Sequence, residues 1–193
     1  MTKSVVKAMD TVSNFTSSKQ FNNQYKVSRF AVAGASKRGW TTWLTAAADS
    51  RVEAFVPMVF DMPNMHEEMH HMWKAYGGWT FAFEDYYDEN LTMDLDTPGF
   101  YGIMNATDPI MFFDRYQGRW KMPIDAVNDE FFMPDDEAFW WNKFPEPKYF
   151  QINPDAEHSL ITAIEELVPT LSTYITLYLE KDARNMPIID WKI

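Results

Sequence analysis

Residues 29–43 read RFAVAGASKRGWTTW, and this stretch decides the fold class. An apolar run ends at Gly34, and residues 36–48 then have the spacing of a helix. A second apolar run, VEAFVPMVF, follows at residues 52–60. A strand, a helix and a strand joined by short links form a βαβ unit, which predicts a parallel sheet with a right-handed crossover.

Ser36, between the first strand and the helix, has two interpretations. In α/β-hydrolases the nucleophilic serine sits on a sharp strand-to-helix turn, and Gly34 stands two residues before Ser36 as that turn requires. The common pattern is G-x-S-x-G, whereas here Arg38 precedes Gly39 and gives G-x-S-x-x-G. The alternative is that Ser36 only caps the helix, since serine is a favoured N-cap residue. The motif alone leaves both open.

An acid and a histidine follow two later predicted strands. Residues 121–127 and 147–152 have strand character, Asp129 comes directly after the first, and His158 comes after the second. The order Ser, acid, His is that of α/β-hydrolase triads, and the carboxyl ends of parallel strands meet where ligands bind. His158 is the candidate base, and its alternative role is to cap the long helix predicted for residues 158–183.

The acid has three candidates. Asp129 lies nearest its strand end and is preferred. Asp135 is the second candidate, although it could instead cap a short helix predicted for residues 135–143. Asp61 is the third, because it follows the second strand. Glu130 is interpreted as a carboxylate at the pocket rim or in solvent.

A competing motif lies at residues 66–70, where HEEMH matches the H-E-x-x-H helix of zinc proteases. On a helix His66 and His70 would share a face, with Glu67 as general base. A third ligand would have to come from Glu84 or Glu89, and neither lies in a second recognisable motif. The favoured interpretation is therefore a polar helix face, with no metal and no cofactor.

The remaining chain predicts a divided domain. Residues 1–61 and 119–186 are expected to form a partial α/β core, residues 62–118 a helical cap insertion, and residues 187–193 the start of a further segment. Within the insertion Trp73, Trp79 and Tyr86 are candidate substrate contacts. Their alternative role is to form the core of the cap itself.

Composition excludes several classes of protein. The 193 residues carry a formal net charge of −11, which disfavours a nucleic-acid partner, and no apolar stretch is long enough to span a bilayer. The chain has no cysteine, which excludes disulfides and thiolate chemistry. No signal peptide is visible, but Asn14, Asn90 and Asn105 each begin a glycosylation triplet, which mildly favours secretion.

Four segments together resemble one known family. GASKRGW at residues 34–40, DTPGFYGIMNATDPIMFFDR at 96–115, NDEFF at 128–132 and PDAEHSL at 154–160 are similar to the PhoPQ-activated pathogenicity-related family, in the same order and at similar spacing. The family shows the G-x-S-x-x-G form and includes a secreted autocrine repressor of proliferation. The resemblance implies an α/β-hydrolase fold with a helical insertion, the C-terminal part of which this chain would supply.

By position the resemblance implies Ser36 as nucleophile, His158 as base and Asp129 as the probable acid. The backbone N–H of Lys37 is the expected oxyanion donor. We therefore expect a serine hydrolase acting on an ester or amide, with a small-molecule or peptide substrate. The alternative is a signalling protein that uses the fold as a scaffold for a cell-surface receptor. Either protein would be secreted or periplasmic.

Family members are much longer and supply strands before the first predicted helix, so the chain is interpreted either as a fragment of a gene product or as a degenerate chain. We expect residues 1–193 alone to leave one sheet edge unpaired. Because a second oxyanion donor comes from an earlier loop in this fold, we also expect them to hydrolyse esters inefficiently.

Overall fold

The computed structural model describes residues 1–21, 25–181 and 186. The segment predicted for residues 187–193 lies outside the described residues.

A parallel sheet forms the centre of the structure. Its strands lie in the order β1-β2-β4-β5, and the short strand β3 also pairs with β2. Every pair of neighbouring strands is parallel. The bounds are Phe30–Ala35 for β1, Val52–Met58 for β2, Trp120–Lys121 for β3, Ile124–Ala126 for β4 and Gln151–Asn153 for β5. The predicted parallel sheet is confirmed.

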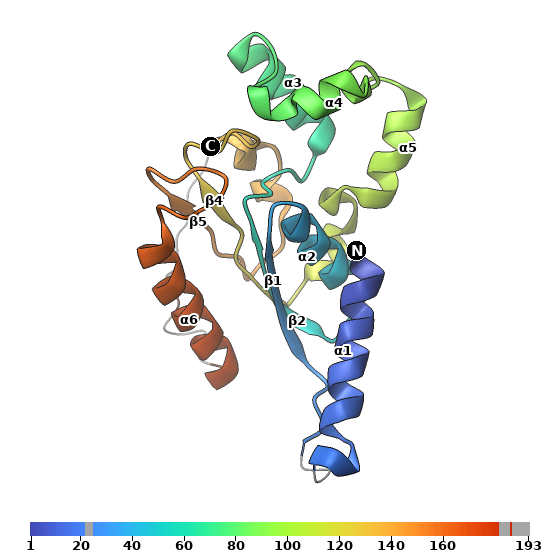
Figure 1. The fold of residues 1–193 in the computed structure, drawn as a ribbon, viewed down its shortest axis with the longest axis vertical. Coiled ribbons are helices and arrows are strands. Elements are labelled where there is room, and N and C mark those ends of the chain that lie inside the picture. The colour runs from blue at the N-terminus through green and yellow to red at the C-terminus, as the bar shows by residue number, and fades with distance from the viewer. Residues whose placement is uncertain (22–24, 182–185, 187–193) are drawn as a thin grey trace.

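Helices cover both faces of the sheet (Figure 1). The helices α1 (Thr2–Thr16) and α2 (Lys37–Ala48) lie on one side, and α6 (Ile164–Glu180) lies on the other. Adjacent residues of β2 face opposite layers: Phe55 packs with Trp43 of α2, whereas Val56 packs with Leu167 of α6. Because side chains alternate along a strand, a strand buried on both faces carries a nearly continuous apolar run, as β2 does apart from Glu53.

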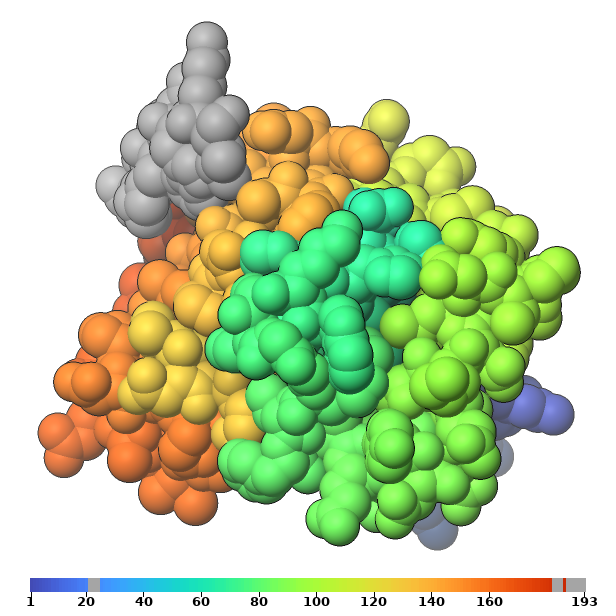
Figure 2. Space-filling view, turned by 90° about the horizontal axis from the view of Figure 1, so that it is seen from above, coloured from blue at the N-terminus to red at the C-terminus, as the bar shows by residue number. Residues whose placement is uncertain are grey.

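The segment between β2 and β3 carries the helices α3, α4 and α5 and lies over the upper end of the sheet (Figure 1). Seen from above, its green residues occupy the centre and right of the molecule (Figure 2). Its elements are α3 (Met65–Tyr76), η2 (Phe81–Phe83), α4 (Glu84–Asp88), η3 (Leu91–Met93), α5 (Pro98–Thr107) and η4 (Pro109–Tyr116). We call residues 62–118 the cap segment. None of the helices in the described ranges combines the length and apolar character that crossing a membrane requires.

Several predicted elements have other bounds. The strand expected over residues 121–127 is interrupted between Lys121 and Ile124, where Pro123 has no N–H to donate to a ladder. The helix expected over residues 135–143 is instead two 3₁₀ turns, η5 (Asp136–Phe139) and η6 (Trp141–Lys143).

The long C-terminal helix begins at Ile164 rather than at residue 158. The segment before it contains Asp155 and Leu160, both with φ near +55° to +58°. Left-handed backbone does not continue a right-handed helix, so His158 lies in a loop between β5 and α6.

Two glycines let α2 approach the strands closely. A Cβ atom on Gly34 would lie 2.7 Å from the carbonyl oxygen of Arg38. A Cβ on Gly39 would lie 2.8 Å from the carbonyl oxygen of Met58 and 2.9 Å from Cβ of Phe60. The second glycine of the motif is therefore needed at position 39, where helix and strand backbones meet, which accounts for the G-x-S-x-x-G spacing.

Gly39→Ala is expected to lower the free energy of unfolding by about 1–3 kcal/mol, the usual cost of overpacking a tight site. Gly102→Ala is the matched control, because Gly102 lies inside α5 with open space around it and alanine favours helix by up to about 1 kcal/mol. Urea unfolding followed by tryptophan fluorescence measures both. Equal stability of the two variants would contradict the close approach.

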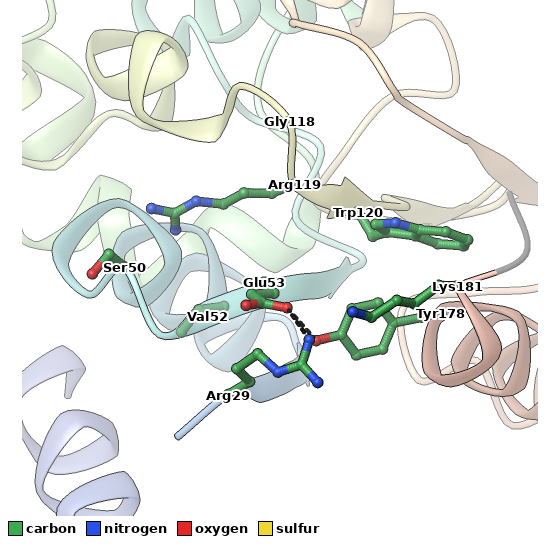
Figure 3. A pocket seen from close by; sticks show the side chains of 9 residues that line it. All are labelled: Arg29, Ser50, Val52, Glu53, Gly118, Arg119, Trp120, Tyr178 and Lys181. Atoms are coloured by element: carbon green, nitrogen blue, oxygen red, sulfur yellow. Dashed lines mark hydrogen bonds and ion pairs between the residues drawn. The ribbon is translucent and has the colours of Figure 1, made fainter. Parts of the chain in front are cut away.

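A hollow of about 430 Å³ opens at the amino-terminal edge of the sheet (Figure 3). Val52 and Trp120, the first residues of β2 and β3, help to line it. Within it Oε2 of Glu53 accepts hydrogen bonds from Arg29 at 3.3 Å and from the Tyr178 hydroxyl at 3.1 Å. Ser36 follows the carboxyl end of β1, so this hollow lies at the opposite end of the sheet from the candidate site.

Candidate catalytic site

Ser36 stands on the turn between β1 and α2 with φ 56° and ψ −127°. A positive φ is uncommon for a residue with a side chain and marks a sharp, strained turn. The Ser36 N–H donates to the carbonyl oxygen of Met58 at 2.9 Å, which ties the turn to β2. Ser36 occupies the N-cap position of α2, yet its hydroxyl makes no capping hydrogen bond. The hydroxyl is therefore available for another partner.

That partner is His158. The Ser36 Oγ lies 2.8 Å from His158 Nε2, and His158 Nδ1 lies 2.8 Å from Asp129 Oδ2. The His158 side chain is 16% exposed and that of Asp129 is 1% exposed, so the imidazole is half-buried and the carboxylate is shielded from solvent. The structure thus brings together the three side chains that the sequence singled out, in a continuous hydrogen-bonded row.

The Asp129 carboxylate is held by its own loop. Oδ1 accepts hydrogen bonds from the N–H groups of Phe131 at 2.7 Å and Phe132 at 3.2 Å. These two bonds fix the carboxylate plane and leave Oδ2 directed at His158. A carboxylate oriented in this way can hold a histidine in one tautomer and stabilise its protonated form.

Three further residues position His158 and were not predicted as site residues. The rings of Phe131 and Phe132 pack against the imidazole, with centroids 4.5 and 5.7 Å from it. Glu130, interpreted from sequence as a carboxylate at the pocket rim or in solvent, accepts a hydrogen bond from the His158 backbone N–H at 3.3 Å. Their position in the sequence could have identified them. In NDEFF all three directly follow Asp129, in the loop that folds back over His158.

The two alternative acids lie elsewhere. Asp135 meets His71 Nε2 at 3.0 Å, and its side chain is 59% exposed. Asp61 is buried and accepts a hydrogen bond from Trp140 Nε1 at 2.6 Å. Both carboxylates thus form their hydrogen bonds with side chains other than His158. Asp129 is the acid that contacts His158.

Asp61 belongs to a group of four buried carboxyls, Asp61, Glu68, Asp125 and Asp136, which we call the buried acid cluster. Burial raises the pKa of Asp61, Glu68 and Asp125 well above the ordinary range, and neighbouring acids raise it further. Burial also raises the pKa of Asp136 to about 8, although the Met133 N–H donates to it at 2.9 Å. Desolvation penalises the charged form, so burial favours the protonated form of each of these carboxyls.

The predicted substrate contacts form part of a connected row of rings. Phe131, which touches His158, contacts Phe83 at 5.8 Å between centroids. Phe83 in turn contacts Trp79 at 5.5 Å and Tyr86 at 5.3 Å, and Trp79 contacts Trp73 at 5.3 Å. The row leads from the base into the cap segment.

Lys37 is the first residue of α2 and directly follows Ser36. N–H groups at a helix N-terminus lack intrahelical partners and favour negative charge. The position of Lys37 therefore suits an oxyanion donor.

The HEEMH motif lies at the start of α3. His66 and His70 share a face of the helix, and both Nε2 atoms meet Asp96 Oδ1, at 2.9 and 3.0 Å. Of the described residues, Asp96 is the carboxylate that joins them, rather than Glu84 or Glu89 as the sequence suggested.

Sequence comparisons match the chain to a family model and to a curated relative. A family model described as PhoPQ-activated pathogenicity-related protein matches residues 1–193. Autocrine proliferation repressor protein A of Dictyostelium discoideum is 39% identical over 199 residues, which cover 100% of this chain and 38% of that protein. The chain thus spans little more than a third of the length of that curated relative.

Solved structures share the fold at low sequence identity. Acetyl xylan esterase 1 from Thermoanaerobacterium sp. JW/SL YS485 matches with a TM-score of 0.58 and 17% identity, over 81% of this chain and 48% of that one. The Pyrococcus furiosus esterase Pf2001 matches with a TM-score of 0.54 and 11% identity, over 83% and 58%. The fold is that of the α/β-hydrolases, as the sequence predicted.

Proposed function

Because this chain belongs to the PhoPQ-activated pathogenicity-related protein family and has an α/β-hydrolase fold, we propose that it carries the catalytic side chains of a serine hydrolase. Its substrate class would be carboxylic esters or amides. The single observation that carries the proposal is the row Ser36 Oγ, His158 Nε2 and Nδ1, Asp129 Oδ2, with both contacts at 2.8 Å. A serine hydroxyl is a weak nucleophile until an adjacent base removes its proton, and this row supplies that base.

The proposed reaction has two halves. Ser36 Oγ attacks the carbonyl carbon while its proton moves to His158 Nε2, and Asp129 stabilises the imidazolium. His158 then gives the proton to the departing alcohol or amine, which leaves an acyl group on Ser36. A water molecule repeats the sequence with His158 as base, releasing the carboxylic acid and restoring the serine. The backbone N–H of Lys37 would stabilise the oxyanion, a role worth roughly 3 kcal/mol per donor in comparable sites.

The aromatic row supports an apolar or aromatic group on the substrate. Trp79 and Tyr86 lie one ring beyond Phe83, and Trp73 lies beyond Trp79, so an acyl or leaving group that extends from Ser36 past Phe131 would meet these rings in turn. We therefore retain Trp73, Trp79 and Tyr86 as proposed substrate contacts. Aromatic side chains are typical linings of small-molecule sites.

Labelling with a fluorophosphonate tests the proposal. The purified natural-length protein is expected to become covalently modified at Ser36, and Ser36→Ala to remain unmodified. Ser159→Ala is the matched control, because Ser159 is exposed and adjacent to His158 but bonds to Glu157 instead. Labelling of Ser36→Ala, or no labelling of the folded wild type, would overturn the proposal. The Ser36 hydroxyl caps no helix, so its loss leaves α2 intact.

A second candidate function rests on the relative's name. Autocrine proliferation repressor protein A is 39% identical across the whole chain, and that name describes a repressor of proliferation rather than an enzyme. In this alternative the fold serves as a scaffold for binding a receptor at a cell surface. Failure of a folded protein to react with fluorophosphonate would favour it, since fold does not fix function.

Either function is proposed to operate outside the cytoplasm. The side chains of Asn14, Asn90 and Asn105, which begin the three glycosylation triplets, are all exposed. They are therefore accessible to the glycosylation that secretory passage in a eukaryotic cell allows.

A further inference from the structure

A cluster in the cap segment brings two imidazoles and a carboxylate to one point. His66 and His70 lie one turn apart on α3, and their Nε2 atoms lie 2.9 and 3.0 Å from Oδ1 of Asp96. Asp96 stands between η3 and α5, far along the chain from the histidines. The three ligand atoms all lie within 4.8 Å of one another. This cluster takes no part in the proposed hydrolysis.

The separations suit ligands of a single ion. Zinc binds imidazole nitrogen and carboxylate oxygen at about 2.0–2.2 Å, which places tetrahedral ligand atoms roughly 3.3 Å apart. The two nitrogen–oxygen separations lie a few tenths of an ångström below that value. Each residue presents the atom with which it would coordinate, so binding requires only small movements of exposed or half-buried side chains.

The surroundings of His66 also favour a cation. Oε1 of Glu67 lies 3.4 Å from His66 Nδ1, and the Tyr101 hydroxyl lies 2.9 Å from His66 Nε2. When the single proton of the neutral ring is on Nδ1 and faces Glu67, the Nε2 lone pair and Asp96 Oδ1 point toward each other and can coordinate one cation between them. Metal-binding histidines commonly donate their other ring N–H to a carboxylate in this way.

We propose that His66, His70 and Asp96 bind a divalent first-row transition metal, with zinc as the expected occupant. The ligand atoms are the two Nε2 atoms and Asp96 Oδ1, Glu67 orients His66, and the Tyr101 hydroxyl borders the open position. A set of two imidazoles and one carboxylate suits zinc better than magnesium or calcium, which prefer all-oxygen sites. The ion would fasten α3 to the segment before α5 and so stabilise the cap segment.

Zinc titration of the chelator-treated, full-length protein tests the proposal. We expect the wild type to bind zinc and Asp96→Ala to bind it at least about 100-fold more weakly. The reason is that removing a ligand should weaken binding no less than removing an outer-shell partner does. His70→Ala should weaken binding similarly. Asp94→Ala is the matched control: it removes an acid from the same loop, two residues away, and should leave the Kd unchanged.

Three results would overturn the proposal. The first is a folded wild type that binds no zinc, and the second is zinc binding that is equally tight in the wild type, Asp96→Ala and His70→Ala. The third is binding that survives Asp96→Ala but is lost in His71→Ala, which would assign the ion to His71, Asp135 and Asp136 instead. Fluorophosphonate labelling of Ser36 should be the same before and after zinc removal, so this test and that of the hydrolase proposal fail separately.

Discussion

Asp129→Asn is expected to slow fluorophosphonate modification of Ser36 by about 10⁴-fold, as removal of the triad carboxylate does in serine hydrolases. The asparagine amide keeps an oxygen that can accept the N–H groups of Phe131 and Phe132, so the loop should keep its shape. Its NH₂ group would then face His158 Nδ1. That arrangement holds the imidazole proton on Nε2, where it blocks acceptance of the Ser36 proton.

Asp135→Asn is the control for this experiment, because Asp135 was the second candidate acid and bonds to His71 instead of His158. Its modification rate should equal that of the wild type within about twofold. The rate constants are measured at several reagent concentrations, with circular dichroism to verify folding. A large loss in Asp135→Asn together with a normal rate in Asp129→Asn would reverse the assignment of the acid.

The sequence could predict the hydrogen-bonded row because its members follow from chain order. A βαβ unit fixes neighbouring parallel strands, and parallel strands deliver Ser36, Asp129 and His158 to the same edge. Strand periodicity and turn position sufficed for this inference. The roles of the three residues stay proposals until they are tested, but their convergence required no knowledge of side-chain packing.

Two of the elements that the sequence failed to predict have a backbone path fixed by contacts far along the chain or by local turns. His158 was expected to begin a helix, yet left-handed residues at Asp155 and Leu160 hold it in a loop. Residues 135–143 have helical composition, but the buried Asp136 accepts the Met133 N–H and the chain turns as 3₁₀ segments. In both places tertiary contacts override the local helix propensity. Such contacts cannot be predicted from the periodicity of the sequence alone.

The partners of the histidines in HEEMH show the same limit. Helical spacing correctly placed His66 and His70 on one face of α3. The carboxylate that meets them is Asp96, whereas the sequence suggested Glu84 or Glu89. Which acid of a loop-rich segment folds back onto a helix depends on the path of every intervening turn, and motif spacing does not describe that path.

The buried acid cluster should make the protein less stable as the pH rises through neutrality. Asp136 illustrates the sign. Burial raises its pKa from the ordinary value of 3.8 to about 8 in the folded protein, so between these pH values the unfolded chain has lost a proton that the folded chain retains. Ionisation then favours unfolding, and the stability that is fully present below about pH 4 declines until about pH 8.

Asp136→Asn is therefore expected to make the free energy of unfolding fall less steeply as the pH rises. One retained proton corresponds to about 1.4 kcal/mol per pH unit, so the variant should gain on the order of 2–3 kcal/mol relative to the wild type between pH 5 and pH 7. An asparagine oxygen can still accept the Met133 N–H, which keeps η5 in place. Asp135→Asn, which changes the adjacent but exposed carboxyl, should alter the slope far less, because Asp135 is only one of several neighbours that raise the pKa of Asp136.

Urea unfolding at unit steps from pH 5 to pH 8 measures the difference directly, because charges outside the cluster affect variant and wild type alike. Parallel stability curves for the wild type and Asp136→Asn would mean that Asp136 is ionised in the folded protein. The carboxylate would then need a positive partner, since a charge with 1% exposure is not tolerated alone. Curves that diverge as the pH rises would instead establish that Asp136 is protonated in the folded protein.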